Sequence, residues 1–118
     1  MNITIKYIDN DFAYIKIDAK SFDFETLHEA KEVIIDIIDN ERQKIILDLR
    51  AMKFMDSIGL SLIVSIFKYT QSVDGVFKLC ALAKQPSELI TIIGLDKLLT
   101  LSKCHMCLVA NKEEEETE

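Results

Sequence analysis

Residues 48–60 read Asp-Leu-Arg-Ala-Met-Lys-Phe-Met-Asp-Ser-Ile-Gly-Leu and directly follow the apolar run Ile45-Ile46-Leu47. The apolar run is short and β-branched at two of its three positions, which is typical of a central strand covered on both faces. We predict that the strand gives way to a connection after Asp48, and that Phe54 and Met55 turn back toward the core. A strand, a short loop and a new helix are therefore expected here.

The new helix is predicted to begin at Asp56 or Ser57, because either side-chain oxygen can accept free backbone N–H groups of a first helical turn. From residue 57 to residue 73, apolar side chains recur at helical spacing in two neighbouring stripes. Gly59 falls in the middle of the apolar arc, where a missing side chain would allow the helix to approach the sheet closely. The remaining strip consists of Ser57, Ser61, Ser65, Lys68 and Ser72.

Small side chains dominate this strip, so another protein's backbone could approach it closely, with the Ser57 hydroxyl at its N-terminal end. The alternative interpretation is that a helix packed on two sides keeps serines on its open side only because they are small. Periodicity alone leaves both interpretations open.

The same region resembles the signature of the STAS domain, which is found in bacterial anti-sigma factor antagonists. The resemblance is carried by Ile46–Leu49, by Phe54 and above all by residues 55–60, Met-Asp-Ser-Ile-Gly-Leu. Upstream, Ser21-Phe22-Asp23 stands where the family usually has glycine, a hydrophobic residue and aspartate. Downstream, residues 94–99 resemble the end of the family's third helix. The chain departs from the family pattern at Ile58, where serine, threonine or alanine is common, and at the missing upstream glycine.

In that family, the serine directly after the motif aspartate is phosphorylated by a partner kinase, and the resemblance assigns this role to Ser57. It implies that the unphosphorylated chain binds an anti-sigma factor serine kinase and releases a sigma factor. Phosphorylation would end the binding, and a protein phosphatase would restore it. The partner-binding residues expected from the resemblance and the serine strip are Asp23, Asp56, Ile58, Gly59, Ser61 and Ser65.

A second function would use the same surface without phosphorylation, in a scaffolding or sensory STAS module or in a subunit of a lipid-transport or anion-transport assembly. A third would make Ser57 a catalytic nucleophile, which needs a base within hydrogen-bond reach. The only histidines are His28 and His105, and the nucleophile-elbow pattern requires glycine where this chain has Met55. With three glycines far apart, no phosphate-binding loop is visible. We therefore expect no catalysis and no cofactor.

Composition limits the possible partners of the chain. A length of 118 residues with 49% hydrophobic content predicts one domain with a single core. The start lacks the pattern of a signal peptide, and no run approaches the roughly 18 apolar residues of a membrane span. The net charge of -6 and the dispersed basic residues argue against nucleic-acid binding. We expect a cytoplasmic protein with protein partners and no membrane insertion.

Three cysteines cannot pair completely, which fits a reducing compartment, and Cys80 lies in an apolar run typical of a buried thiol. Cys104 and Cys107 form a lone C-x-x-C near the C-terminus. A structural zinc site would need two further ligands, and a redox pair normally opens a helix just after an early strand. We therefore expect no metal site.

The element order predicted along the chain is β-β-α-β-α-β-α, an α/β fold with a mixed, mainly parallel sheet and helices packed against it. Residues 1–111 are expected to form a single STAS-like domain, in which residues 100–110 could be a strand, a short helix or both. Residues 112–118 contain five glutamates and are expected to be a solvated, disordered tail. The predicted elements are strands Ile3–Ile8, Phe12–Asp18, Ile45–Leu49 and Val76–Leu82, and helices from about Asp23, from Ser57, and from Pro86 to Gly94.

Overall fold

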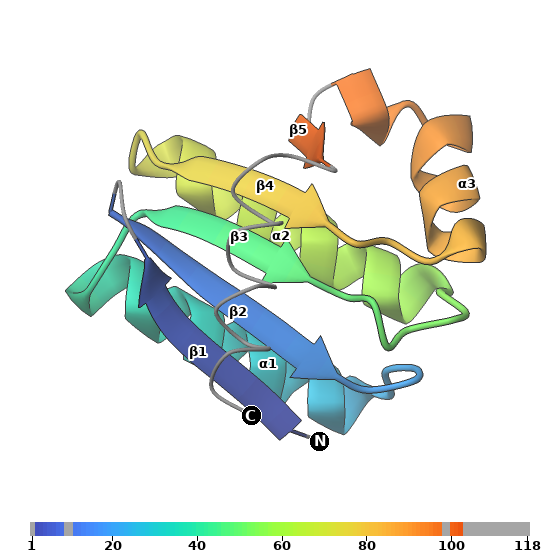
Figure 1. Cartoon of the computed structure of the whole chain (residues 1–118), viewed down its shortest axis with the longest axis horizontal. Coiled ribbons are helices and arrows are strands. Elements are labelled where there is room, and N and C mark those ends of the chain that lie inside the picture. Colours follow the sequence, from blue (N-terminus) through green and yellow to red (C-terminus); the bar gives the residue numbers. More distant parts are fainter. Residues whose placement is uncertain (1, 9–10, 98–99, 103–118) are drawn as a thin grey trace.

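The computed structural model describes residues 2–8, 11–97 and 100–102 (Figure 1). The expectations for Cys104, Cys107 and the acidic tail lie outside the described residues. The predicted order β-β-α-β-α-β-α is confirmed, and a short 3₁₀ turn and one more strand follow it. The elements are β1 (Asn2–Ile8), β2 (Phe12–Asp18), α1 (Phe24–Asn40), β3 (Lys44–Asp48), α2 (Ser57–Ser72), β4 (Val76–Cys80), α3 (Lys84–Ile92), η1 (Leu95–Lys97) and β5 (Thr100–Ser102).

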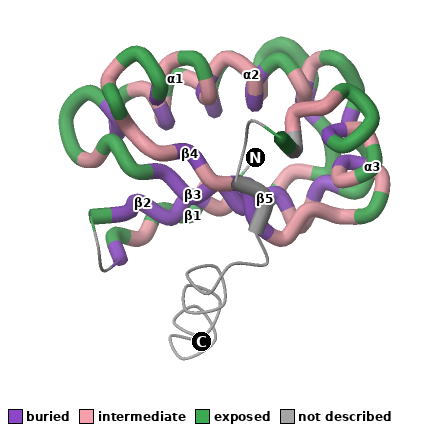
Figure 2. Tube along the Cα trace, turned by 90° about the horizontal axis from the view of Figure 1, so that it is seen from above, coloured by how far each residue is buried: buried purple, intermediate pink, exposed green. Residues whose placement is uncertain are grey.

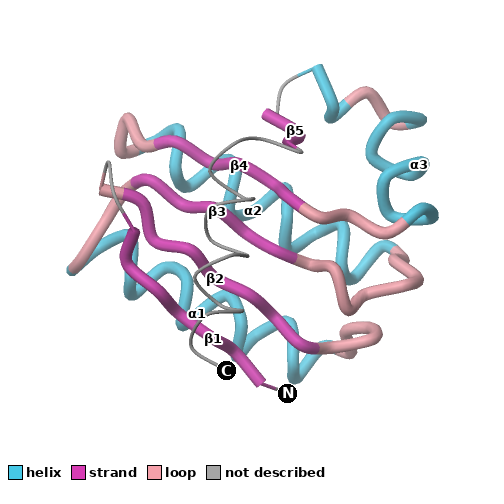
Figure 3. Tube along the Cα trace, viewed as in Figure 1, coloured by secondary structure: helices cyan, strands magenta, loops and turns pink. Residues whose placement is uncertain are grey.

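The five strands of the described residues form one sheet in the order β1-β2-β3-β4-β5 (Figure 3). β1 pairs with β2 in an antiparallel hairpin, and every other neighbouring pair is parallel. The strand β5 lies within the stretch for which the sequence left strand and helix open. Because β2, β3 and β4 are parallel, their carboxyl ends meet at one edge of the sheet. The loops that lead into α1, α2 and α3 therefore gather at that edge.

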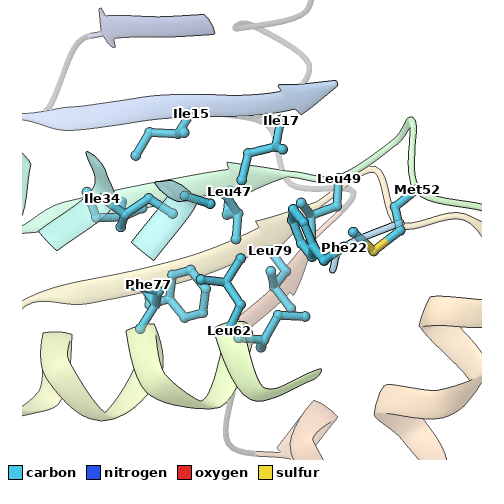
Figure 4. Packing of buried hydrophobic residues seen from close by; sticks show 14 of the residues in the cluster. Ile15, Ile17, Phe22, Ile34, Leu47, Leu49, Met52, Leu62, Phe77 and Leu79 are labelled. Atoms are coloured by element: carbon cyan, nitrogen blue, oxygen red, sulfur yellow. The ribbon is translucent and has the colours of Figure 1, made fainter. Parts of the chain in front are cut away.

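α1 and α2 lie together on one face of the sheet (Figure 2). Alternate strand residues point toward them, as the period of two requires. Figure 4 shows side chains from the strands, such as Leu47 and Leu79, meeting Ile34 of α1 and Leu62 of α2. The opposite face has its own smaller cluster, built from Ile8, Phe12, Tyr14, Ile46 and Cys80.

A charged residue lies buried where β3 ends on this opposite face. Asp48 is 0% exposed and accepts a hydrogen bond from the Tyr14 hydroxyl. Arg50, whose side chain is 36% exposed, donates to the same carboxylate through Nε at 2.9 Å and Nη2 at 2.5 Å. The Arg50 backbone N–H also donates to Asp48, at 2.9 Å. The carboxylate thus ties β2 and β3 to the start of the loop that leads to α2.

Replacing Asp48 with asparagine should lower the free energy of unfolding by about 1–3 kcal/mol, because hydrogen bonds to a charged group are lost inside the fold. Urea denaturation would measure this change, with Asp18→Asn as the control, since Asp18 is an exposed residue at the end of β2. Equal midpoints for the two variants would contradict a structural role for the buried carboxylate.

Candidate functional site

Helix α2 begins at Ser57 because the residue before it is a side-chain cap. Asp56 has an extended backbone, with φ -115° and ψ -165°, and its Oδ1 accepts the backbone N–H groups of Ile58 at 3.0 Å and Gly59 at 3.3 Å. The sequence allowed either Asp56 or Ser57 as the cap, and the structure shows that the cap is Asp56. Ser57 is the first residue of the helix and is exposed.

The loop before this cap is held by two methionines. Met52 and Met55 are 1% and 2% exposed, whereas Phe54 is 59% exposed. The prediction that Met55 turns back into the core is confirmed, but the same prediction for Phe54 is wrong. Met52 and Met55 both turn inward beside Phe22 (Figure 4 shows Met52 and Phe22). The Phe54 side chain, directly before Met55, therefore faces solvent.

Gly59 makes room for this loop rather than for the sheet. Gly59 is buried, and a Cβ atom there would lie 3.1 Å from Met55 Cγ, 3.5 Å from Phe22 Cδ2 and 3.6 Å from Met52 Sδ. The sequence correctly placed Gly59 in the apolar arc, but the close approach that it permits is to these three side chains. Its role in the site is therefore to let the loop pack against the first turn of α2.

Gln85 of α3 clamps the backbone of the same loop. Its Oε1 accepts the Met55 N–H at 2.6 Å, and its Nε2 donates to the Met55 carbonyl at 3.0 Å. Sequence reasoning missed this residue, because the contact joins positions 30 apart and Gln85 belongs to no motif. The clamp connects α3 to the position of Ser57 two residues further along the chain.

Replacing Gln85 with alanine should lower the free energy of unfolding by about 1–2 kcal/mol, because two backbone groups lose their partner. The backbone amide of Met55 should also exchange with deuterium faster than in the wild type. Gln71→Ala, which removes an exposed glutamine from α2, is the control and should leave both quantities unchanged. Unaltered exchange at Met55 in Gln85→Ala would show that the loop holds its shape without the clamp.

The N-terminus of α1 lies at the same edge of the sheet and is also capped by an aspartate. Asp23 Oδ1 accepts the Thr26 N–H at 2.8 Å, and the Asp23 N–H donates to Thr26 Oγ1 at 2.9 Å, which completes a capping box. The bond from the Thr26 backbone, supported by its hydroxyl, lowers the pKa of the Asp23 carboxyl below its ordinary value of 3.8. The first helical residue, Phe24, is 75% exposed.

The lowered pKa of Asp23 predicts a pH dependence of stability. A carboxyl whose pKa is lowered by folding stabilises the folded state above its unfolded pKa, and this contribution disappears as the pH falls through the folded pKa. Thermal melts of Asp23→Asn should therefore differ from the wild type above pH 3.8 and converge with it in more acidic solution. Gln71→Ala, which removes an exposed side chain that does not titrate, should melt like the wild type across the same pH range.

The structure places the predicted site residues at the cap and the first three turns of α2 and at the cap of α1. Exposed side chains are found at Asp23, Asp56, Ser57 and Ser61, whereas Ile58 and Ser65 are half-buried and Gly59 is buried. The Ser61 hydroxyl donates to the Ile58 carbonyl at 2.7 Å, within the helix. The expected exposed strip is therefore open at Ser57 and Ser61 and partly covered at Ser65.

The described part of the chain contains neither a cluster of metal ligands nor a helix that could span a membrane. Within residues 2–8, 11–97 and 100–102, no group of three or more histidine, cysteine, aspartate or glutamate side chains could hold a metal ion. His28 lies on α1 beside Glu32, with 2.9 Å between Nε2 and Oε1. None of the helices described has the length and apolar character that a membrane crossing requires.

The chain belongs to the STAS domain family, whose model matches residues 4–112. A comparison with curated proteins finds no match.

Several solved structures share the fold. A candidate anti-sigma factor antagonist from Thermotoga maritima is 21% identical, with 92% of each chain covered and a TM-score of 0.75. The Bacillus cell fate determinant SpoIIAA in its phosphorylated form is 15% identical, with 93% of this chain and 98% of that chain covered and a TM-score of 0.71. A chain from the stressosome, described as a signal integration and transduction hub, is 20% identical, with 83% and 85% covered and a TM-score of 0.62.

Proposed function

We propose that this STAS protein is an anti-sigma factor antagonist of the cytoplasm. In its unphosphorylated form it binds an anti-sigma factor serine kinase and so releases a sigma factor. The observation that carries the proposal is the position of Ser57, exposed on the first turn of α2 and directly after the capping Asp56. The similarity to structures described as antagonists, one of them in a phosphorylated form, supports this assignment.

Phosphorylation of Ser57 acts as the switch in this proposal. A phosphate adds about -1.5 to -2 charges at neutral pH. The N-terminus of a helix carries about +0.5 charge and tolerates an anion. The loop beneath is anchored by Met52, Met55 and Gln85, so the fold survives the modification. A protein phosphatase removes the phosphate and resets the switch.

The effect of the phosphate falls on the partner-binding surface. Asp23 and Asp56 are exposed caps at the same edge of the sheet, so the phosphate joins a rim that is already acidic. Juxtaposed like charges can cost several kcal/mol, and each 1.4 kcal/mol is about tenfold in affinity. A kinase surface that fits this rim in the unmodified protein is repelled after modification. Ile58, Ser61 and Ser65 continue the binding surface along α2, and Gly59 shapes it from beneath.

The protein has no catalytic activity of its own in this proposal. Nucleophilic use of Ser57 needs an adjacent base. Of the two histidines, His28 lies in the described part of the chain, where it pairs with Glu32 of α1.

A scaffolding role is the second candidate, and the similarity to the stressosome chain favours it. A scaffold would assemble through the same surface without a change in affinity on phosphorylation. The native mass of complexes purified from the source organism separates the two functions, since a scaffold gives large multimers and a switch gives a small complex with a kinase.

The switch is tested by capturing the partner kinase from the source organism and titrating it calorimetrically against variants. Ser57→Ala should bind as tightly as the wild type, while Ser57→Asp and phosphorylated Ser57 should bind at least about tenfold more weakly. Ser72→Asp adds the same charge at the far, exposed end of α2 and should bind normally. Equal affinities of the alanine and phosphorylated forms would refute the switch.

The reach of the binding surface along α2 is tested with arginine substitutions. Ser61→Arg should leave the free energy of unfolding within about 0.5 kcal/mol of wild type, because the position is exposed. It should nevertheless weaken kinase binding, since a long side chain one turn from Ser57 obstructs close approach. Ser65→Arg should have a smaller effect on binding, and Ser72→Arg none. Normal binding by Ser61→Arg would place the interface on the loop before Asp56 or at the start of α1.

A further inference from the structure

Two exposed phenylalanines lie beside the aspartates that cap α1 and α2. All six phenylalanines of the chain are in the described residues, and four of them are buried or half-buried. The other two are Phe24, which is 75% exposed, and Phe54, which is 59% exposed. The first directly follows the α1 cap Asp23, and the second lies two residues before the α2 cap Asp56. Both exposed phenylalanines therefore belong to the edge of the sheet at which Ser57 lies.

The two exposed side chains lie near one another, because their buried neighbours in sequence meet over the first turn of α2. A Cβ atom on Gly59 would lie 3.5 Å from Phe22 Cδ2 and 3.1 Å from Met55 Cγ. Phe24 lies two residues after the first of these side chains, and Phe54 lies directly before the second. Figure 1 likewise shows the loops that lead into α1 and α2 at the same end of the sheet. One partner surface can therefore contact both phenylalanines.

The backbone that carries each phenylalanine is fixed by hydrogen bonds. Directly after Phe54, Gln85 binds the N–H group and the carbonyl of Met55, at 2.6 and 3.0 Å. At the start of α1, the Asp23 capping box is joined by the bond from the Leu27 N–H to the Asp23 carbonyl, at 3.0 Å. A side chain on a fixed backbone loses less conformational freedom on binding than one on a mobile loop. Both phenylalanines are therefore preorganised for contact with a partner.

The fold itself makes little use of these two side chains. Neither belongs to the hydrophobic clusters of the described residues, whereas the buried methionines of the loop before α2 do. Single exposed apolar side chains are common on protein surfaces. A pair of fixed aromatic side chains at a binding edge is different, because aromatic residues supply much of the energy of protein interfaces.

We infer that Phe24 and Phe54 are the apolar anchors through which this chain binds its serine kinase, each inserted into an apolar pocket of the kinase surface. The anchors are continuous with the binding surface proposed above, because the same edge carries Asp23, Asp56 and Ser57. The inference rests on the proposed function and adds to it the side chains that supply most of the affinity.

The anchors also give a second reason why a phosphate on Ser57 would weaken binding. Ser57 is three residues beyond Phe54, so the phosphate and its bound water lie at the margin of the apolar contact. Insertion of the anchors would remove water from this anion, which is costly without a compensating positive charge. Phosphorylation therefore opposes the insertion of the anchors in addition to repelling acidic groups of the kinase.

Alanine substitutions at the anchors, titrated calorimetrically with the captured kinase, test the inference. Phe24→Ala and Phe54→Ala should each weaken binding by about tenfold or more, since each removes a large apolar contact. Phe54→Met keeps apolar volume at the position and should recover most of that loss. The matched control is Ile92→Ala, because Ile92 is 80% exposed and lies on α3, about two turns beyond Gln85. The control should bind as tightly as the wild type.

Two further measurements separate the anchors from effects of structure and of charge. The urea midpoints of both anchor variants should match that of the wild type, because the truncated side chains are exposed. The ratio of the wild-type affinity to the Phe54→Ala affinity should be the same at about 0.1 M and about 1 M salt, since salt screens charges and not apolar contacts. A ratio that falls toward one at high salt would contradict an apolar anchor.

Ser57→Asp is measured beside these variants, so that failure of the anchors is distinguished from failure of the proposed function. If both anchor variants bind like Ile92→Ala while Ser57→Asp binds weakly, the anchors are refuted and the switch stands. If the anchor variants bind weakly while Ser57→Asp and phosphorylated Ser57 bind normally, the switch is refuted and the anchors stand. A lower molecular mass of either anchor variant than of the wild type, measured by sedimentation without kinase, would also overturn the inference. The phenylalanines would then join two copies of this chain.

Discussion

The site depends on one interaction, the acceptance of the Ile58 and Gly59 backbone N–H groups by the Asp56 carboxylate. This cap determines where α2 begins and places Ser57 on its first turn, exposed at the edge where the parallel strands end. The cap can form only if the loop before Asp56 keeps a fixed conformation. Packing of Met55 and the Gln85 clamp on its backbone provide that support from the core and from α3.

The residues that stabilise the loop and the cap differ from the residues that a partner would contact. The groups that hold the loop are buried or hydrogen-bonded beneath Ser57, while the groups that a partner meets are exposed side chains around it. A charge added at Ser57 therefore acts mainly on binding, where like-charge contacts can cost several kcal/mol.

Local patterns were sufficient to predict the element order, the Asp56 or Ser57 cap and the burial of Gly59, because periodicity and capping depend on neighbours in sequence. Contacts between distant residues could not be read in this way. Gln85 clamps Met55 across 30 positions, and the Tyr14 hydroxyl reaches Asp48 across 34. Phe54 shows a related limit, because hydrophobicity alone does not decide which apolar side chain of the loop is buried. Met52 is buried in the core, whereas Phe54 is exposed. The family resemblance supplied the role of Ser57, which periodicity left open.

The central claim is that a phosphate on Ser57 changes the surface and leaves the fold intact. The most direct measurement compares backbone amide NMR spectra of the unmodified protein and of protein made with phosphoserine at position 57. The account predicts shift changes confined to the first turn of α2, the loop before Asp56 and the start of α1, with unchanged amides in β2 and β3. Widespread changes through those strands, or loss of dispersed signals, would contradict it.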